Sequence, residues 1–449
     1  MSAIQAMTGK MWDLIVVGGG LTGVAAAVSA RREGLEVLLV EQAGFLGGAP
    51  GTLLINPFMP YYTTVNGDRF ELSRGFFSEL RQLLAEAGGY RGGGRQEEDI
   101  HEEYLKLALD RLVAREGVQP LFHATLCGVE KTGETLEAVK VATKAGVLTF
   151  RSRCFIDCTG DADLAAMAGC PYHLGREDGL CQPMTLCFRI GNVDIPTFQK
   201  NRQAMQEKYK RLQAEGKISN PRENVLIFST LVDGVLHFNT TRVVKHNPTD
   251  PFDVTEAEMI AREQMFEMFD FLRENCPGFE KSQLLYSAGS IGARESRMID
   301  GEYLLTENDL RGCVQFDDAI AAGNYDIDIH NPEGTGTSHY YFPAGTWYTI
   351  PYRALLPRNA GNLLVAGRCI STTHEAQASI RIMPIVATLG QAAGVAAALA
   401  VKGGQGVKEI DVKALQDILV ENGAFIGKEE MKGERACCSG SSRRWRRSM

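Results

Sequence analysis

The glycine-rich turn at residues 16–23, VVGGGLTG, constrains the fold more than any other stretch of the chain. Gly18 would permit a tight turn, Gly20 would let a pyrophosphate approach the backbone, and Gly23 would let a helix pack on the preceding strand. The N-terminus of that helix would offer free N–H groups and a positive dipole end to phosphates. The spacing therefore predicts a phosphate-binding turn, with a glycine-rich turn that binds no ligand as the alternative.

The segments on either side of the turn complete a βαβ unit. We expect a strand over residues 13–17, a helix over residues 24–32 and a second buried strand over residues 36–40. Glu41 ends the second strand, where its carboxylate can accept hydrogen bonds from an adenosine ribose and would repel the 2′-phosphate of NADP. The unit therefore indicates a dinucleotide other than NADP, and it leaves NAD and FAD open.

Three later stretches extend the pattern beyond the first phosphates. Gly48 and Thr52 follow Glu41 closely, and the stretch FIDCTGDAD places a turn at residues 159–161 after an apolar strand. The stretch NLLVAGRCIS leads into an alanine-rich helix that begins near Pro384. Any one of the three could be an ordinary turn. In this order and at these distances they resemble the flavoproteins of the glutathione-reductase-like FAD-binding superfamily.

A closer resemblance covers nearly the whole chain, from residue 12 to about residue 426. It rests on the stretches VVGGGLTG, LVEQAGFLGGAPGT, FIDCTGDADLAAMAG, SIGARESRMIDGEY, IPYRALLP and NLLVAGRCISTTHEAQASIRIMPIVATLGQAAGVAA. The chain resembles the FAD-dependent oxidoreductase family related to the flavin domain of heterodisulfide reductase. This resemblance implies FAD, a two-domain fold and redox chemistry. The cysteine-rich iron–sulfur motifs of heterodisulfide reductases are missing from the sequence.

The resemblance also implies which residues hold FAD. The flavin ring would meet the N-terminus of the late helix at Met383, where the helix dipole would stabilise negative charge on the reduced ring. Arg381 would add to that stabilisation or form a surface salt bridge instead. The expected FAD-binding residues are Gly18, Gly20, Thr22, Gly23, Glu41, Gly48, Thr52, Leu126, Thr159, Gly160, Asp161, Gly367, Arg381 and Met383.

The expected catalytic residues are His374, Arg294 and Arg297. His374 is expected on a loop that passes the flavin edge, where it could accept or deliver a proton as hydride moves to or from N5. A structural histidine bonded to the backbone is the alternative. Arg294 and Arg297 suit a carboxylate or another anionic group of the substrate. They could instead pair with Glu295 and Asp300 and hold a domain interface.

No metal site is expected. His330 lies between acidic residues in a polar loop, but the spacing around it supports a solvated loop rather than a set of metal ligands. The loop is long enough to be a substrate cap. The chain also has no second GxGxxG turn after a strand and no CxxxxC redox pair, so electrons are expected to pass through the substrate or a partner protein.

The predicted fold is α/β, with a discontinuous Rossmann-like FAD/NAD(P)-binding domain of the GR2 type and an inserted α+β substrate domain. The FAD-binding domain would comprise residues 11–174 and 351–427, and the substrate or cap domain residues 175–350. Within the insertion, a capping box at Thr255 predicts the start of a helix that runs to about Asn275. The basic tail, residues 428–449, is expected to be disordered.

Composition excludes several partners. The net charge of −8 argues against nucleic acid, and eleven cysteines without CxxC spacing indicate free thiols in a cytoplasmic protein. Residues 382–401 are apolar and long enough to span a membrane. However, their Ala and Gly content, together with Pro384 and Gln391, favours a buried helix that packs closely through small residues, with no membrane contact.

These observations predict an FAD-dependent oxidoreductase that transfers hydride between flavin N5 and a small polar substrate, which could be anionic. A flavin-dependent reductase of C=C bonds in enoates, similar to the fumarate-reductase-like flavoproteins, is one alternative. An electron-transfer flavoprotein that serves as one subunit of a larger redox complex is the other. A small-molecule substrate is the expected partner, and a redox partner protein and a homo-oligomer remain open.

Overall fold

The computed structural model describes residues 3–92 and 98–427, so the predicted tail at residues 428–449 lies outside the described residues. A seven-stranded sheet forms its centre, in the order β7-β2-β1-β10-β9-β8, and β21 pairs with β10 beside this path. The strands are β1 (Met11–Val17), β2 (Val37–Val40), β7 (Gln119–Leu121), β8 (Thr125–Thr132), β9 (Thr135–Thr143), β10 (Gly146–Asp157) and β21 (Leu363–Val365). The sheet confirms the predicted strands before and after the glycine-rich turn.

Strand β10 joins two halves of this sheet that differ in direction. Its first part pairs antiparallel with β9, and its second part runs parallel to β1 and β21. Strands β2 and β7 continue the parallel half beyond β1. The carboxyl ends of β1, β2, β10 and β21 therefore meet at one edge, which is where parallel α/β sheets bind ligands.

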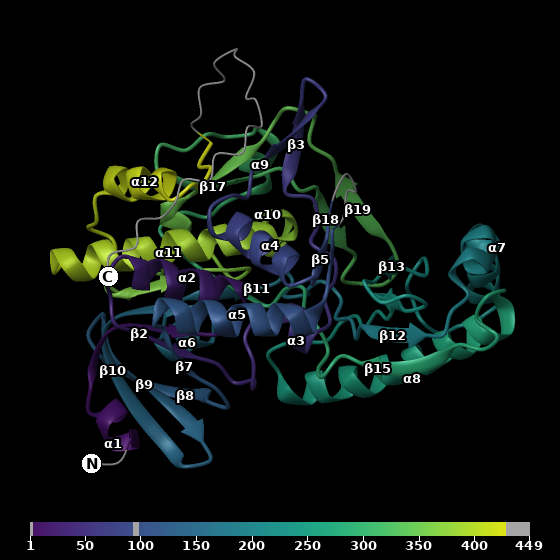
Figure 1. The fold of residues 1–449 in the computed structure, drawn as a ribbon, viewed down its shortest axis with the longest axis horizontal. Helices are drawn as coiled ribbons and strands as arrows, with labels where there is room; N and C mark the ends of the chain where they lie inside the picture. The colour runs from purple at the N-terminus through teal and green to yellow at the C-terminus, as the bar shows by residue number, and fades with distance from the viewer. Residues whose placement is uncertain (1–2, 93–97, 428–449) are drawn as a thin grey trace.

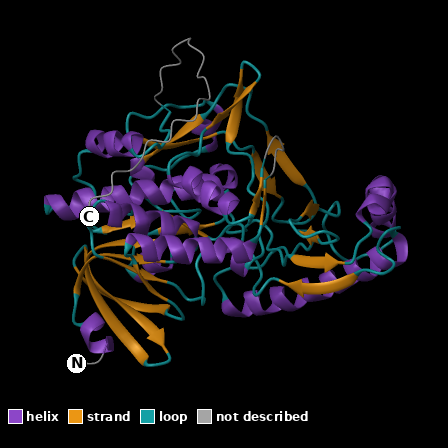
Figure 2. Ribbon diagram, viewed as in Figure 1, coloured by secondary structure: helices purple, strands orange, loops and turns teal. Residues whose placement is uncertain are grey.

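Side chains of β1 alternate between two hydrophobic cores. Leu14 and Val16 belong to the larger core, and Ile15 and Val17 belong to the core on the other face of the sheet. Both faces are covered, so the strand reads as a continuous apolar run rather than as an alternating one. In Figures 1 and 2, helices cover one face near α2 (Leu21–Arg32), α4 (Phe76–Glu86), α5 (Glu102–Glu116) and α11 (Met383–Gly403).

Helix α11 packs tightly against α2 through two glycines. A Cβ atom on Gly390 would lie 2.1 Å from the carbonyl oxygen of Thr22, and one on Gly394 would lie 2.2 Å from that of Ala26. In the described part of the chain, α11 is the one helix whose length and composition would suit a membrane span, and 89% of its apolar window is buried inside the protein. Its small residues therefore serve close helix–helix packing.

A second, four-stranded sheet lies away from the first, in the order β13-β14-β12-β15. Its strands pack with α7 (Ile195–Ala214) and α8 (Pro251–Asn275) around a core of their own, at the right of Figure 1. These strands are β12 (Phe188–Gly191), β13 (Ile227–Ser229), β14 (Leu236–Phe238) and β15 (Gln283–Ser287). Whether residues 175–350 form a separate domain stays a prediction.

The predicted start of α8 at Thr255 is wrong. The helix begins one turn earlier, because the carboxylate of Asp250 accepts hydrogen bonds from the backbone N–H groups of Phe252 and Asp253. Pro251 occupies the first helical position, where its missing N–H costs nothing. The predicted end at Asn275 is confirmed.

The remaining elements are short. The helices are α1 (Ala3–Thr8), α3 (Ala49–Thr52), α6 (Asp163–Met167), α9 (Glu307–Arg311), α10 (His374–Ile380), α12 (Val412–Glu421) and the 3-10 helix η1 (Tyr352–Leu355). The paired strands are β3 (Tyr62–Val65) with β4 (Asp68–Glu71), β5 (Tyr90–Arg91) with β6 (Asp99–Ile100), β11 (Tyr172–Leu174) with β16 (Arg297–Ile299), β17 (Ala319–Gly323) with β20 (Tyr348–Pro351), and β18 (Ile327–His330) with β19 (Thr337–Tyr340). Strands β17 and β20 contribute to the same core as α11.

Candidate active site

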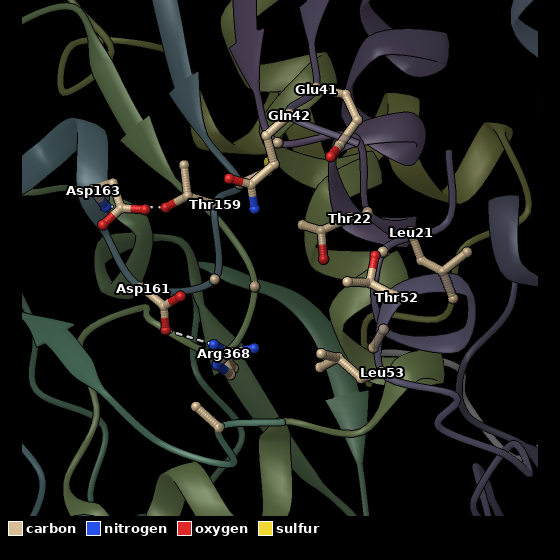
Figure 3. A pocket seen from close by; sticks show the side chains of 18 of the residues that line it. Leu21, Thr22, Glu41, Gln42, Thr52, Leu53, Thr159, Asp161, Asp163 and Arg368 are labelled. Carbon is tan, nitrogen blue, oxygen red and sulfur yellow. Dashed lines mark hydrogen bonds and ion pairs between the residues drawn. The ribbon is translucent and has the colours of Figure 1, made fainter. Parts of the chain in front are cut away.

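A cavity of about 350 Å³ opens at the carboxyl edge of the parallel strands. Figure 3 shows side chains from the first βαβ unit on one side of it and from the segment after β10 on the other. The wall includes Gly18, Gly20, Leu21, Thr22, Glu41, Gln42, Gly48, Thr52, Leu53, Leu126, Thr159, Gly160, Asp161, Asp163, Met184, Ala293, Gly367, Arg368, Arg381 and Met383. Every expected FAD-binding residue except Gly23 lines this cavity.

The three glycines of the turn differ in what surrounds them. Gly18 has a φ of +99°, and a Cβ atom there would lie 2.3 Å from the carbonyl oxygen of Cys158. A Cβ atom on Gly23 would lie 1.8 Å from the carbonyl oxygen of Gly18, so Gly23 serves packing. A Cβ atom on Gly20 would meet only the Cα of Gly48, at 3.8 Å. The protein alone therefore does not require glycine at position 20, but a ligand lying against the backbone would.

Glu41 closes the other side of the turn at the end of β2. Its carboxylate accepts hydrogen bonds from the backbone N–H groups of Gly19, at 2.6 Å, and Ala43, at 2.7 Å. Burial raises the pKa of Glu41, and these backbone donors oppose that rise. The side chain is thus fixed before any ligand arrives, and each oxygen keeps a lone pair that can accept from a ribose hydroxyl.

The turn after β10 is organised by Asp157, which is fully buried. Its carboxylate accepts from the N–H and hydroxyl of Thr159 and from the N–H of Ala165. Burial raises the pKa of Asp157 to about 6. Further along this turn, Asp161 pairs with Arg368 at 2.5 Å, as Figure 3 shows. The turn predicted at residues 159–161 therefore lies against the segment that follows β21.

Arg368 is a cavity residue that the sequence analysis missed. It follows Gly367 directly, and its Nε is buried without a hydrogen-bond partner among the described residues. The signal was present in the sequence, since Arg368 is the first charged residue after the apolar strand β21. A guanidinium beside Gly160 with a buried, free N–H suits the diphosphate of a dinucleotide.

The far end of the cavity is formed by Arg381 and the N-terminus of α11. The predicted start of this helix at Met383 is confirmed, with Pro384 in its first turn. Arg381 forms an ion pair with Asp328 at 3.3 Å, and both side chains are largely buried. The alternative predicted for Arg381 was a salt bridge at the surface. The salt bridge is present, but it is largely buried rather than at the surface. The predicted flavin contact of Arg381 stays a prediction.

His374 was expected on a loop, but it is the first residue of helix α10. The hydroxyl of Thr373 accepts from the N–H of Ala376 and caps the helix just ahead of the histidine. The ring of His374 is 5% exposed, and its Nδ1 lies 2.8 Å from both carboxylate oxygens of the fully buried Glu295. His374 is not among the residues that line the cavity.

Arg294 and Arg297 also lie outside the cavity lining, and they point to different places. Arg297 pairs with Asp163 at 2.8 Å, on the turn after β10. Arg294 donates only to neutral acceptors within the described residues. Neither arginine pairs with Glu295 or Asp300, because Glu295 binds His374 and Asp300 binds His173. The suggested interface pairing is therefore wrong.

His330 is not in a solvated loop. It ends strand β18 and is 6% exposed, and its Nδ1 lies 3.0 Å from a guanidinium nitrogen of Arg242. Burial, and next the charge of Arg294, hold the pKa of His330 well below its usual range. The polar residues of this stretch led to the prediction of a loop, but residues 327–330 form strand β18, which pairs with β19. Among the described residues, no group of three or more His, Cys, Asp or Glu side chains could hold a metal ion.

Comparison with known proteins agrees with this geometry. The profile of the family described as FAD dependent oxidoreductase matches residues 13–419. Dihydrolipoamide dehydrogenase from Chaetomium thermophilum is 36% identical over 61 residues, which are 12% of this chain and 12% of that enzyme.

Among solved structures, the aromatic hydroxylase CabE from angucycline biosynthesis is 13% identical with a TM-score of 0.46, over 92% of this chain and 65% of that chain. A geranylgeranyl bacteriochlorophyll reductase-like protein from Thermoplasma acidophilum is 13% identical with a TM-score of 0.45, over 93% and 84%. The family match spans most of the chain, and this protein is therefore a member of the FAD-dependent oxidoreductase family with FAD as its cofactor.

Proposed function

We propose that this enzyme oxidises or reduces a small polar organic molecule by hydride transfer with bound FAD. FAD supplies a two-electron acceptor or donor at N5 of its flavin ring. One observation carries the proposal: His374 and Glu295 form a buried hydrogen-bonded pair, and Glu295 lies two residues after Ala293, which lines the cavity. Hydride transfer from a hydroxyl-bearing carbon requires such a group to take the proton of the hydroxyl.

The residues that would hold FAD have the chemistry that the cofactor requires. Gly20 leaves the backbone open to a pyrophosphate, and the unpartnered Nε of Arg368 supplies a buried donor. The N-terminus of α2 directs free N–H groups toward the same place. Glu41 would accept from the adenosine ribose, and the N-terminus of α11 at Met383 would face the flavin ring.

The contacts of His374 determine how it would handle a proton. A hydrogen bond from Nδ1–H to the carboxylate of Glu295 leaves Nε2 as the nitrogen that accepts a proton. Glu295 is held in turn by the backbone N–H of Gln182, at 2.8 Å. Because Ala293 lines the cavity two residues before Glu295, the pair lies close to the cavity wall. Glu295 is therefore a positioning residue, and His374 is the proton acceptor or donor.

Gln377 supports this arrangement from α10. Its side-chain amide donates to the carbonyl of Arg294 at 2.8 Å and accepts from the amide of Gln182 at 3.1 Å. The three segments that carry Gln182, Arg294 and Gln377 are thereby tied together beside the cavity. Such a network fixes the rotamers of catalytic groups before substrate binds.

An anaerobic screen tests the proposal. The FAD-loaded protein is mixed with alcohols and hydroxy acids while the visible flavin absorption is followed. Bleaching by one of them supports hydride transfer from a substrate. If no compound bleaches the flavin but an enoate reoxidises the chemically reduced protein, the enzyme is a C=C reductase instead. If neither occurs and the protein forms a tight complex with an iron–sulfur protein, its role is electron transfer within a larger complex.

A further inference from the structure

An exposed apolar stripe runs along the outer face of helix α8. Its side chains, Phe252, Met259 and Phe266, are 83%, 62% and 52% exposed. Because they follow one another at intervals of seven residues, close to two helical turns, they project in nearly the same direction. In Figure 1, α8 lies along the lower right edge of the molecule. The stripe is therefore open to solvent over a length of about 21 Å.

The stripe is large for the surface of a monomer. With these exposed fractions, its three side chains leave roughly 400 Å² in contact with solvent. The largest apolar patch on a typical monomer measures about 300 to 600 Å² and often has a function. The opposite side of the same helix is already buried, since Ala257, Ala261 and Met265 belong to hydrophobic cores. Apolar residues on both sides of a helix indicate that both sides are covered.

The sequence of the stripe is symmetric about Met259. One phenylalanine stands seven residues before it, and another stands seven residues after it. Glu256 stands three residues before it and Arg262 three residues after it, and their side chains are 69% and 51% exposed. Apolar side chains are thus repeated at mirrored positions, whereas the charges at mirrored positions are opposite.

We propose that two copies of this chain form a dimer in which their α8 helices pack antiparallel about a two-fold axis at Met259. This axis places Phe252 opposite the partner's Phe266, and Met259 opposite the partner's Met259. It also places Glu256 opposite the partner's Arg262, so that two ion pairs form across the axis. A two-fold contact requires a self-complementary surface of this kind.

The charges select the antiparallel arrangement. In parallel packing, Glu256 would face the partner's Glu256 and Arg262 the partner's Arg262, and such like-charge contacts are costly. Within its own chain, Glu256 lies 3.6 Å from His246, and Arg262 lies 3.0 Å from Glu258. Both side chains nevertheless keep more than half of their surface exposed, so each can reach a partner.

The size of the contact predicts a dimer that dissociates on dilution. Two copies would remove roughly 800 Å² of the apolar stripe from water. Glu256, Arg262 and Glu263, which would face the partner's Thr255, add to this area. The contact thus approaches the lower limit of about 1,200 Å² for stable interfaces, where transient complexes are found.

Helix α8 also forms part of the cavity wall. Val254, two residues after Phe252, lines the cavity. Glu258 accepts a hydrogen bond from the backbone N–H of Ile291, another cavity residue, at 2.6 Å. A second copy packed on α8 would therefore restrain this part of the wall from outside. The contact between the two copies does not depend on the reaction proposed above.

The mass of the FAD-loaded, full-length protein in solution tests the dimer. Size-exclusion chromatography with light scattering, over a range of protein concentrations, should show the mass of two chains falling toward that of one on dilution. Met259→Glu places two carboxylates at the two-fold axis and should raise the Kd of the dimer about 100-fold or more. Val147→Glu is the matched control, because Val147 is 63% exposed but belongs to the central sheet, so this variant should remain a dimer.

A charge exchange tests the antiparallel register. Arg262→Glu alone and Glu256→Arg alone should each weaken the dimer, because each places like charges opposite one another. The two substitutions together restore opposite charges across the axis and should restore the dimer. Loss of the ion pair between Arg262 and Glu258 within one chain is not repaired by the second substitution, so it cannot produce this rescue. Flavin content and melting temperature show whether each variant is folded.

Three results would overturn the proposal. The native chain could be a monomer at every concentration, which would leave the stripe to a different partner. Met259→Glu could dimerise as tightly as the native chain. The double charge exchange could fail to restore the dimer although the protein is folded. None of these results bears on hydride transfer, which the anaerobic screen measures separately.

Discussion

The two ends of the cavity are built in different ways. At the glycine-rich end, one continuous stretch of chain supplies the turn, the helix start and Glu41, and backbone groups make the contacts. At the Arg381 end, side chains from distant segments meet, as in the ion pair of Arg381 with Asp328 and the hydrogen bond of the Gln377 amide to the carbonyl of Arg294. The first end suits a cofactor that many proteins share, whereas the second can be altered residue by residue to suit one substrate.

Substitutions at two glycines of the turn should separate packing from cofactor binding. Gly23→Val should destabilise the protein by roughly 4 kcal/mol or more, because its Cβ would collide with the backbone of Gly18. Gly20→Val should leave a folded protein that binds no FAD, since the space beside Gly20 is open to the cavity. Chemical denaturation and the flavin content of the purified variants measure the two effects.

Each of these two glycine predictions has a result that would contradict it. A Gly20→Val variant that purifies with full flavin would show that no pyrophosphate lies against this backbone. A Gly23→Val variant as stable as the native chain would remove the distinction between the two positions.

A change at the other end should leave the cofactor in place. His374→Ala is expected to retain FAD and to lower kcat roughly 100-fold to 10,000-fold, because the proton acceptor is lost. Glu295→Gln should lower kcat less and leave KM unchanged, because Glu295 acts through His374. Flavin content and steady-state kinetics with a substrate from the anaerobic screen test this, and unchanged turnover in His374→Ala would exclude the histidine.

A milder change at the glycine-rich end should weaken cofactor binding without abolishing it. Glu41→Gln replaces one carboxylate oxygen by an NH2 group, which would face the N–H of Gly19 or Ala43. We expect the Kd for FAD to rise about tenfold, which corresponds to roughly 1.4 kcal/mol. Fluorescence titration of the apoprotein with FAD measures it, and an unchanged Kd would mean that Glu41 only shapes the turn.

The smallest expected effect concerns a buried histidine in the second sheet. His237 is fully buried, both ring nitrogens lack partners in the described structure, and its ring stacks on Phe228. Burial, and next the charge of Arg189, hold the pKa of His237 well below its usual range. His237→Phe should therefore stabilise the protein by about 1 kcal/mol or more at neutral pH, because two unsatisfied polar atoms are removed.

The same histidine sets a pH dependence. Below a pH of about 6.5, the unfolded chain takes up a proton at His237 and the folded protein does not, so the free energy of unfolding falls with falling pH. In His237→Phe this decline should be shallower by up to about 1.4 kcal/mol per pH unit. Urea denaturation between about pH 5 and about pH 8, where histidine titrates, measures the slope. Identical slopes in the two proteins would contradict this account.

The glycine-rich end could be predicted because its contacts are local in sequence. Strand, turn, helix and acidic residue follow one another, and the start of α11 is marked by Pro384. Arg368 was missed although it directly follows Gly367, which was among the expected FAD-binding residues. His374 was wrongly placed on a loop, although the cap at Thr373, Glu375 in the first turn and the helix formers Ala376 and Gln377 all favour a helix here.

The Arg381 end could not be predicted in the same way. Arg294 was identified as an anion-binding residue from its arginine neighbour Arg297, but that neighbour turns to Asp163. The side chains that surround Arg294 come from segments far away in the sequence, such as those of Thr185 and Asn239. Arg242, which contacts His330, gave no sequence signal, since it stands in no motif.

The sequence by itself determined the βαβ unit, the family and the cofactor, because glycine spacing and apolar runs act through local sterics and backbone hydrogen bonds. Only the tertiary structure decided which charges are buried together and which lack a partner. Burial and pairing depend on contacts between segments that are far apart in the chain. The ion pair of Arg381 with Asp328 and the hydrogen bond of His374 with Glu295 exist only once folding has brought those segments together.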